Sequence, residues 1–286
     1  MIEIPSGEYL IGTNEQEAGF ASDREGPQVK VTLPAFLIDA TTVTNADFAE
    51  FVAATGYVTE AEAIGWSFVF AYFLKEIEEK YQHPVPNLAW WKAVQGANWR
   101  HPEGPGSTLA GRLDHPVVQV SRNDALAYCH WAKKRLPTEA EWEVAAKGGQ
   151  TYERYPWGET FLINDQYQCN IWQGAFPKEN TLADGFSNTA PVKSYAPNGY
   201  GLYQMIGNVW EWCVNPRGIP LKAFGEISGQ AFWQQYQKSD DANYATKGGS
   251  FLCHDSYCKR YRIAARNGNS GTSASNNLGF RCVKSL

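Results

Sequence analysis

Two cysteines near the end of the chain, Cys253 and Cys258, are the residues whose types and spacing could do chemistry. Four residues separate them, and His254 and Tyr257 are among the four. From the spacing alone, the pair could form a disulfide across a tight loop, hold a soft metal ion, or remain two unrelated thiols. Thiolates are the ligands that select copper(I), and two of them would leave the ion open to a substrate thiol. Nearby cations favour the thiolate form, and three follow closely: Lys259, Arg260 and Arg262.

Composition restricts the kind of protein that could carry this pair. Hydrophobic residues make up 43% of the 286 residues and charged residues 19%, which excludes a mainly disordered chain. No apolar run approaches the roughly 20 residues of a membrane span. The net charge of -5 is small and the basic residues form no stripe, so we expect neither nucleic acid nor a membrane as a partner. The first residues lack the basic and apolar regions of a secretory signal, so we expect a cytoplasmic location.

The first quarter of the chain must supply short strands and one helix. From Glu3 to Asp39, apolar runs alternate with turn residues, which is typical of short strands. The segment Asn45 to Thr55 follows Thr44, a good N-cap residue, and this predicts a helix. The segment Trp66 to Gln82 is ambiguous, because its alternating aromatic residues fit a strand whereas Leu74 to Lys80 fits a helix.

Two further helices are expected on either side of Leu136-Pro137. One begins where Ser121 and Asp124 form a capping pattern, and the other begins at the capping box of Thr138 and Glu141. The second of these ends at Gly148-Gly149. The first has an apolar face and a basic last turn, where cations suit the helix dipole: Ala125, Cys129 and Ala132, then Lys133, Lys134 and Arg135.

The rest of the chain carries little periodicity. Beyond Gly149 it is rich in Gly, Asn, Asp and aromatic residues, so we expect mostly ordered loop, which in a compact domain usually means function or a bound metal. No internal repeat, low-complexity tract or linker is visible. We therefore expect one domain over residues 1–286.

Several tracts of the sequence match one known family. They are IPSGEYLIGT, ATGYVTEAE, GANWRHPEGP, DHPVVQVSRNDALAYCHWAKKRLPTEAEWE, NIWQGAFP, NGYGLYQMIGNVWEW, GGSFLCHDSYCKRYR and NLGFRC. Through them nearly the whole chain resembles the formylglycine-generating enzymes, also called sulfatase-modifying factors. The resemblance implies an α+β fold of one domain, low in regular secondary structure and related to C-type lectin domains. Relatives of this fold often lack the late cysteine pair, so Cys253 and Cys258 indicate the catalytic branch.

The resemblance implies an oxidation at the cysteine pair. Cys253 and Cys258 would bind Cu(I), and the partner would be an unfolded sulfatase, or another protein, that presents a Cys-x-Pro-x-Arg motif. The thiolate of the motif cysteine would join the two protein thiolates on the copper ion. O2 would then oxidise the motif cysteine to formylglycine through a thioaldehyde that water hydrolyses. Ser250 matches the active-site serine of the family, although it could be only a turn residue. Trp210 matches a tryptophan that lines the pocket, although it could be only a core ring.

The residues inside and beside the pair have weaker assignments. His254 and Tyr257 could order water or oxygen, or could simply be solvated. Three tryptophans are candidates for stacking on an extended peptide, although aromatic core is the commoner role of such residues: Trp90, Trp91 and Trp99.

Two Ca2+ sites are also implied by the resemblance. Calcium prefers oxygen donors from side chains and backbone carbonyls. The first set consists of the side chains of Asn170 and Asp184 and the carbonyls of Ile171 and Phe186. The second set consists of Gln204, Gly207, Val209 and Glu211. Gln204 stands where the family has Asn, and its longer side chain puts this ligand in doubt.

The other cysteines have structural interpretations. The resemblance pairs Cys129 with Cys282 in a disulfide, although a reducing cytoplasm would keep them as thiols. A second disulfide of the family is missing, because Ala146 and Ile263 occupy its positions. Cys169 and Cys213 have no counterpart and are expected to be small buried residues.

Two rival functions remain to be weighed. Iron-dependent sulfoxide synthases share the fold, but they use a histidine cluster, and the five His of this chain form no spaced set. A non-catalytic binding module of the lectin-like kind is the other rival, and it would not need two thiols in one loop. By analogy with the family we expect a monomer.

Overall fold

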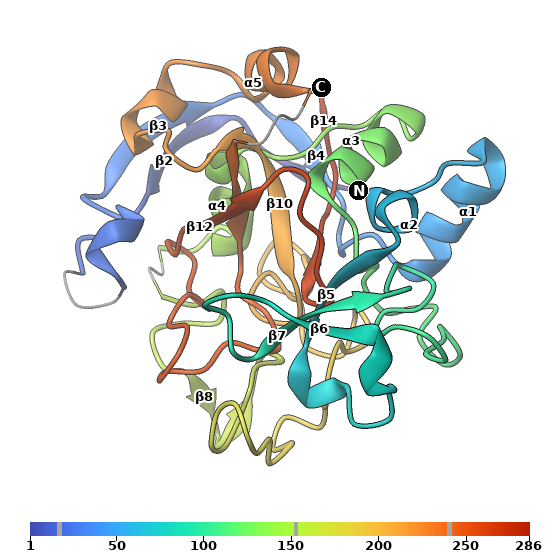
Figure 1. Ribbon diagram of the computed structural model, residues 1–286. Helices are drawn as coiled ribbons and strands as arrows, with labels where there is room; N and C mark the ends of the chain where they lie inside the picture. Colours follow the sequence, from blue (N-terminus) through green and yellow to red (C-terminus); the bar gives the residue numbers. More distant parts are fainter. Residues whose placement is uncertain (16–18, 152–153, 239–241) are drawn as a thin grey trace.

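Four short strands open the chain in the computed structural model, which describes residues 1–15, 19–151, 154–238 and 242–286 (Figure 1). They are β1 (Ile2–Ile4), β2 (Gly7–Ile11), β3 (Val29–Leu33) and β4 (Phe36–Ile38), so the predicted β-rich opening is confirmed. β2 pairs with β3, while β1 and the last strand, β14 (Val283–Ser285), both pair with β4. The first and last strands of the chain therefore lie in one sheet.

The largest sheet contains the strands that bracket the cysteine pair. Its order is β12 (Asn267–Ser270), β11 (Asn243–Lys247), β10 (Trp210–Pro216) and β13 (Leu278–Gly279). β10, orange in Figure 1, is antiparallel to β11 and parallel to β13. Because β11 leads into the cysteine loop and β12 follows it, this sheet fixes both ends of that loop.

The three predicted helices are present, and capping interactions explain where each begins. α1 (Asn45–Thr55), α3 (Arg122–Trp131) and α4 (Glu139–Lys147) each start at a Thr or Ser whose side chain accepts a hydrogen bond from the third helical residue. The prediction that Lys133 to Arg135 form the last turn of α3 is wrong. The helix ends at Trp131, Lys133 adopts a left-handed conformation with φ of 55°, and Arg135 bridges to Val283 instead.

The ambiguous segment forms a strand and then irregular turns. A small sheet holds β5 (Trp66–Phe70), β7 (Trp91–Gln95) and β6 (Gln82–Pro84), and the short helix α2 (Glu60–Ile64) precedes it. The helical alternative for Leu74 to Lys80 is wrong, because only 3-10 turns occur there, at Ala71–Phe73 and Glu79–Tyr81. Seven residues without a capping side chain are too few for a stable helix, and Leu74 packs into a small core with Val69 and Val94 instead.

After α4 the chain is mostly loop, as predicted, up to β10. The only regular structure of the described residues in that stretch is a hairpin of β8 (Leu162–Ile163) and β9 (Gln166–Tyr167). Beyond residue 209 the loops alternate with the strands β10 to β14, a 3-10 helix at Leu221–Gly225 and the helix α5 (Gly229–Tyr236). The fold is therefore α+β, with few helices and several small sheets, as expected.

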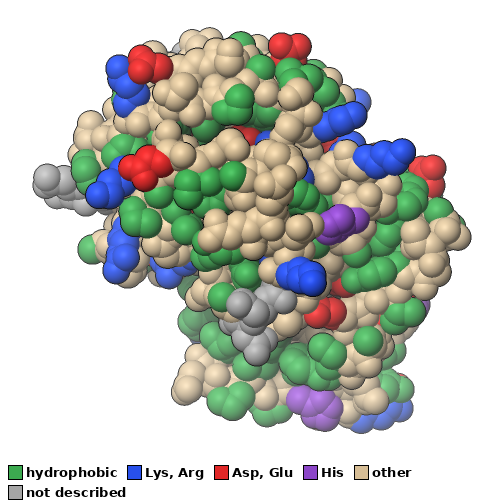
Figure 2. Space-filling view, turned by 90° about the horizontal axis from the view of Figure 1, so that it is seen from above, with side chains coloured by type: hydrophobic (Ala, Val, Ile, Leu, Met, Phe, Trp, Pro, Cys, Tyr) green, Lys and Arg blue, Asp and Glu red, His purple; other side chains and the backbone are tan. Residues whose placement is uncertain are grey.

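Large aromatic rings fill the core, and charges of both signs cover the outside. Trp99, Trp142, Trp172 and Trp212 are among the largest fully buried side chains. On the face seen from above, Lys and Arg side chains lie beside Asp and Glu rather than gathering in one area (Figure 2). Within the described part of the chain, no helix combines the length and the apolar character needed to cross a membrane.

Candidate active site

A glycine turn delivers the cysteine loop from the end of β11. Gly248 and Gly249 have φ of 93° and 78°, a region that L-residues with side chains rarely adopt. A Cβ on Gly249 would also lie 3.0 Å from the Cα of Tyr261. The chain then turns back on itself, because the Cys258 N–H donates to the carbonyl of His254 at 2.7 Å. This turn brings the sulfurs of Cys253 and Cys258 to 2.8 Å from one another.

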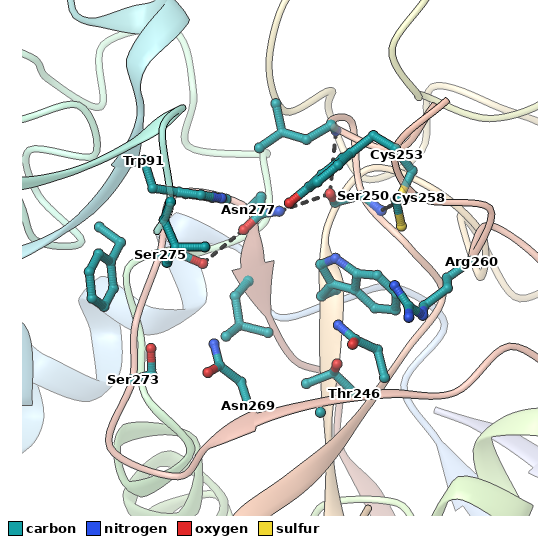
Figure 3. Close-up of a pocket in the computed structure, with 18 residues that line it drawn as sticks. Trp91, Thr246, Ser250, Cys253, Cys258, Arg260, Asn269, Ser273, Ser275 and Asn277 are labelled. Atoms are coloured by element: carbon teal, nitrogen blue, oxygen red, sulfur yellow. Dashed lines mark hydrogen bonds between the residues drawn. The ribbon is translucent and has the colours of Figure 1, made fainter. Parts of the chain in front are cut away.

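The two sulfurs lie in the wall of a cavity of about 380 Å3. Cys253 and Cys258 are 1% and 6% exposed, and both are free thiols. The predicted residues Ser250 and Trp210 line the same cavity (Figure 3). The structure therefore brings together the four residues that the sequence singled out. The rest of the wall includes Phe68, Leu88, Trp91, Thr246, Tyr257, Arg260, Asn267, Asn269, Ser273, Ser275 and Asn277.

Ser250 is held in place by a chain of hydrogen bonds. Its Oγ accepts from Asn277 Nδ2 at 2.9 Å and from the Leu252 N–H at 3.3 Å, and Ser275 Oγ donates to Asn277 Oδ1 at 2.8 Å (Figure 3). The Ser250 N–H also approaches the sulfur of Cys253 at 3.4 Å, so Ser250 lies directly beside the pair.

The two thiols have different pKa values because their surroundings differ. The pKa of Cys258 is lowered because Cys253 donates a hydrogen bond to its sulfur and because the Arg260 backbone and guanidinium lie beside it. Burial raises the pKa of Cys253 well above its usual value, and the neighbouring sulfur of Cys258 raises it further. Cys258 is therefore the thiol that ionises first.

The aromatic residues that the sequence suggested for substrate contact lie in three places: in the cavity wall, against a wall residue, and in the core. Trp91 lines the cavity, as does Tyr257, which stacks on Phe176 at 4.6 Å between ring centroids. Trp90 packs edge-on against Tyr257 at 5.5 Å. The prediction for Trp99 is wrong, because this ring is 1% exposed and packs in the core. His254 does not line the cavity, and its Nδ1 pairs with Ser256 Oγ at 2.8 Å.

Comparison with known proteins identifies the family. A family model described as the sulfatase-modifying factor enzyme 1-like domain matches residues 1–286. The chain belongs to this family. A formylglycine-generating enzyme of Thermomonospora curvata is 50% identical over 99% of this chain and 92% of its own, and one of Bos taurus is 47% identical over 99% and 74%.

Similar proteins also mark the limits of the comparison. An inactive C-alpha-formylglycine-generating enzyme 2 of Bos taurus is 43% identical over 99% of this chain and 87% of its own. Among solved structures, PvdO from Pseudomonas aeruginosa has a TM-score of 0.68 at 22% identity, covering 99% of this chain and 93% of its own, and this likeness concerns the fold alone. Membership of the sulfatase-modifying factor family therefore does not by itself decide whether a chain is active.

The first oxygen set predicted for Ca2+ fits a cation. Asn170 is 1% exposed, and its Oδ1 is buried without a hydrogen-bond partner among the described residues. The Gln173 amide donates to both the Ile171 carbonyl and Asp184 Oδ2, so these two oxygens face one partially positive group. Burial raises the pKa of Asp184, and a bound cation would offset that cost. The carbonyl of Phe186 is the fourth donor of this set.

The second oxygen set fits a cation poorly. Gln204 Oε1 is buried without a partner in the described part of the chain, as a ligand would be. However, Glu211 already accepts two hydrogen bonds of 2.7 Å from Arg281 and one from Trp142 Nε1. The charge of Glu211 is therefore balanced by Arg281. The other donors, Gln204 and the backbone of Gly207 and Val209, are neutral, so the set offers Ca2+ no uncompensated carboxylate.

The remaining cysteines are buried thiols. Cys129 and Cys282 lie side by side with 3.5 Å between their sulfurs, but the structure has them as free thiols and not as the disulfide that the resemblance implied. Cys169 and Cys213 are fully buried, as predicted, and burial raises the pKa of both well above its usual value. None of these four cysteines lines the cavity that contains Cys253 and Cys258.

Sequence reasoning missed the polar partners of the cysteine pair. Asn277 was quoted only as part of the NLGFRC tract, yet it supports Ser250 directly. Ser275 and Thr246 carried no signal, because isolated hydroxyl residues are common in loops and strands. Arg260 was recognised as a nearby cation, but its partner Asp23 lies 237 residues away in sequence.

Proposed function

We propose that this chain is a copper(I)-dependent oxidase that converts the cysteine of a Cys-x-Pro-x-Arg motif in sulfatases to formylglycine with O2. The observation that carries the proposal is the pair of buried free thiols, 2.8 Å apart, in the wall of the polar and aromatic cavity that Ser250 and Trp210 also line. The active relatives at 50% and 47% identity bear the name of this activity.

The donor atoms favour copper(I) over other metals. Soft thiolate ligands select Cu(I), whereas iron and zinc sites usually require His or carboxylate ligands as well. Among the described residues, which include all five His, no group of three His, Cys, Asp or Glu could hold a metal ion. This argues against the iron-dependent sulfoxide synthase. When bound at Cys253 and Cys258, copper(I) would take up the substrate thiolate and supply an electron-rich centre for the reduction of O2.

The protein side chains around the sulfurs would orient the reactants. Ser250 lies beside Cys253 and is fixed by Asn277. Its Oγ accepts hydrogen bonds from two neighbouring N–H groups, so its hydroxyl proton can be donated to an oxygen species beside the pair. Trp210, 7% exposed, contributes a large apolar surface to the cavity wall. Trp91 lies farther from the sulfurs in the cavity wall (Figure 3) and offers a flat face to an extended peptide.

The overall reaction balances with one external reductant. The substrate loses one hydrogen from its β-carbon and one from its thiol, which gives a thioaldehyde. Water then hydrolyses the thioaldehyde to the aldehyde and releases hydrogen sulfide. Overall, the cysteine side chain, O2 and two reducing equivalents from an added thiol give the aldehyde, hydrogen sulfide and one water. The reaction takes place on the substrate peptide, and Cys253 and Cys258 are unchanged at the end of each turnover.

Mass spectrometry of a peptide tests the proposal directly. The copper-loaded protein is incubated with a synthetic peptide that contains Cys-Thr-Pro-Ser-Arg, with O2 and a thiol reductant. We expect a mass loss equal to the difference between CH2SH and CHO, and no change in a peptide with Ser in place of Cys. If the thiol peptide stays intact with copper and also with iron, the proposal fails and the alternative of a non-catalytic binding module is favoured.

We also propose that Ca2+ at Asn170, Ile171, Asp184 and Phe186 stabilises the loop that precedes β10. Free calcium at a hundred times its dissociation constant should raise the free energy of unfolding by about 2.7 kcal/mol. Asp184→Asn keeps the shape of the side chain and removes its charge, so it should abolish this increment. Thermal unfolding with calcium and with a chelator measures it. The control Asp165→Asn, in the exposed β8–β9 turn, should keep the increment, and an unchanged increment in Asp184→Asn would contradict the assignment.

A further inference from the structure

A buried carboxylate, paired with two partly exposed arginines, adjoins the cysteine pair. Asp23, whose side chain is 0% exposed, ends the 3-10 helix at Ala21–Asp23. It accepts hydrogen bonds from Arg260 Nε at 2.5 Å, from Arg260 Nη2 at 3.1 Å, and from Arg217 Nη2 at 2.6 Å. Phe20 covers the Arg260 guanidinium with 4.5 Å from its carbon to the ring centroid. Asp23 and Phe20 thus fix the position of this guanidinium.

Arg260 is the member of the cluster that reaches the cavity. It is the only charged residue in the cavity wall among the described residues, and it shares that wall with Cys258, two residues before it in the chain. Figure 3 shows its guanidinium pointing from the cysteine loop toward the interior of the cavity, below Cys258. The other two members of the cluster, Asp23 and Arg217, lie behind it and are absent from the wall.

Charge counting links this cluster to the metal centre. Two guanidinium groups and one carboxylate leave one positive charge in excess. A copper(I) ion held by two thiolates carries one negative charge in excess, and the attraction between such charges is strong where water is excluded. The cluster therefore has the sign and the position needed to balance the loaded site.

We infer that Arg260 supplies the fixed positive charge that balances a copper(I) ion at Cys253 and Cys258, and that Asp23 is a positioning residue that holds Arg260 there. The inference rests on the proposed function, since it presumes that the pair binds copper(I). It assigns a role to the N-terminal segment, which is distant from the cysteines in sequence.

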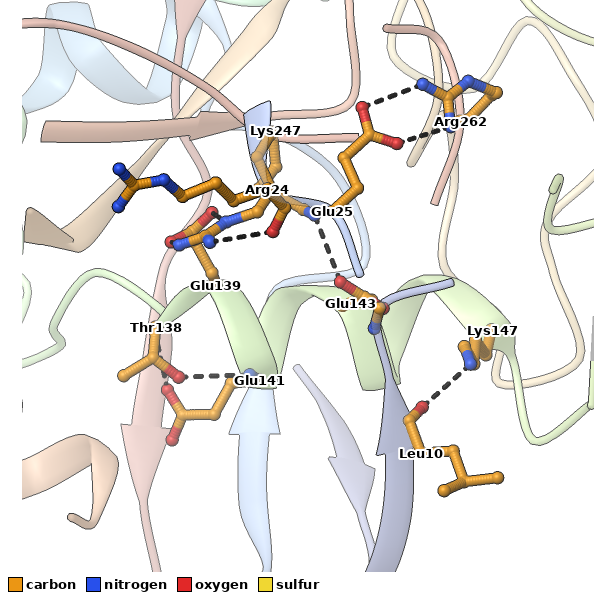
Figure 4. Close-up of polar contacts among 12 residues, drawn as sticks. Leu10, Arg24, Glu25, Thr138, Glu139, Glu141, Glu143, Lys147, Lys247 and Arg262 are labelled. Carbon is orange, nitrogen blue, oxygen red and sulfur yellow. Dashed lines mark hydrogen bonds and ion pairs between the residues drawn. The ribbon is translucent and has the colours of Figure 1, made fainter. Parts of the chain in front are cut away.

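A neighbouring ion pair provides a matched control. Arg262, two residues after Arg260, pairs with Glu25, two residues after Asp23, at 2.7 and 2.9 Å (Figure 4). The two pairs join the same segments of chain, but Arg262 is absent from the cavity wall. A general loosening of the cysteine loop would follow from breaking either pair, whereas the loss of a balancing charge would follow from removing Arg260 alone.

Copper(I) affinity, measured without O2 by competition with a chromophoric chelator, tests the inference. Arg260→Gln should weaken the affinity by roughly tenfold or more, because it removes the charge that lines the cavity wall together with Cys258. Arg262→Gln should lower the melting temperature and leave the copper(I) affinity within about twofold of the wild type, because it makes no contact with the pair. Equal losses in the two variants, or no loss in Arg260→Gln, would overturn the inference.

A double-mutant cycle tests the role of Asp23. Asp23→Asn should weaken copper(I) binding in the same direction as Arg260→Gln, and the double variant should bind no more weakly than Arg260→Gln alone, because Asp23 acts through Arg260. Arg260→Lys keeps the charge but loses the two-pronged pairing, so its affinity should lie between those of the wild type and Arg260→Gln. Unchanged or tighter binding by Asp23→Asn would refute positioning.

The wild-type measurement separates the two proposals. If the wild type binds no copper(I), the proposed function fails. If the wild type binds copper(I) tightly and Arg260→Gln binds it equally well, the proposed function stands and the inference about Arg260 and Asp23 fails. Should Asp23→Asn not fold, as judged by its thermal unfolding, Arg260→Gln and Arg262→Gln still decide the question.

Discussion

Replacing Cys258 by Ser is expected to abolish the conversion of a Cys-x-Pro-x-Arg peptide while the protein remains folded. One thiolate cannot form the two-sulfur site, and a hydroxyl oxygen is a poor ligand for copper(I). Cys258 is 6% exposed and lies beside Arg260, so the smaller hydroxyl can hydrogen-bond there, and the cost in stability should be about 1 kcal/mol. Mass spectrometry of the peptide over time should show no more formylglycine than a reaction without the protein.

Two further variants complete this test. Cys253→Ser should remove tight copper(I) binding as well as turnover, because Cys253 is the other sulfur of the pair. Cys169→Ala is the control, since this buried cysteine does not line the cavity, and it should retain both properties. Unchanged turnover in Cys258→Ser would refute the mechanism, and a fully metal-loaded Cys253→Ser would refute that ligand assignment.

The helices could be predicted because their signals are local. The N-caps Thr44, Ser121 and Thr138 each act on a residue three positions away, so the sequence alone contains the whole interaction. The end of α3 could not be predicted in this way. Arg135 leaves the helix because its partners are Glu141, at 2.6 Å, and the strand β14, and no local rule identifies such partners.

The central strand β10 was missed because it follows no alternating pattern. Trp210 to Asn215 are all buried, on both faces of the strand. Its polar residues are satisfied from elsewhere: Glu211 by Arg281, and Asn215 by Glu139 at 2.8 Å. The burial of a carboxylate and an amide within this strand depends on contacts between distant segments, which periodicity cannot reveal.

The candidate site, like the fold, could be predicted from the sequence only where its residues are close together in the chain. Cys253, Cys258 and Ser250 lie within nine residues of one another, and one tract of sequence carries them all. Their supports come from other parts of the chain. Asn277 comes from the segment just before β13 and Asp23 from the N-terminal segment. The reactive groups are therefore visible in the sequence, whereas the residues that hold them become visible only in the fold.

Replacing Glu211 by Gln is expected to destabilise the fold by about 3–5 kcal/mol, because it leaves a buried guanidinium without its counter-charge. Arg281 and Glu211 are 0% and 1% exposed at the side chain and meet through two hydrogen bonds of 2.7 Å. Trp142, from α4, donates to the same carboxylate. One pair thus joins β10, α4 and the segment before β14. Urea denaturation at fixed pH measures the loss.

Two controls separate the charge from the shape of this pair. Arg100→Gln breaks an exposed pair with Glu62, 3.5 Å apart, and should change the stability by less than about 1 kcal/mol. Glu211→Gln combined with Arg281→Met removes both charges and should recover part of the loss, since the unpaired charge is gone while the carbonyls of Asp39, Ala40 and Tyr203 lose this donor. If Glu211→Gln alone costs less than the exposed pair, Glu211 is not the counter-charge of Arg281.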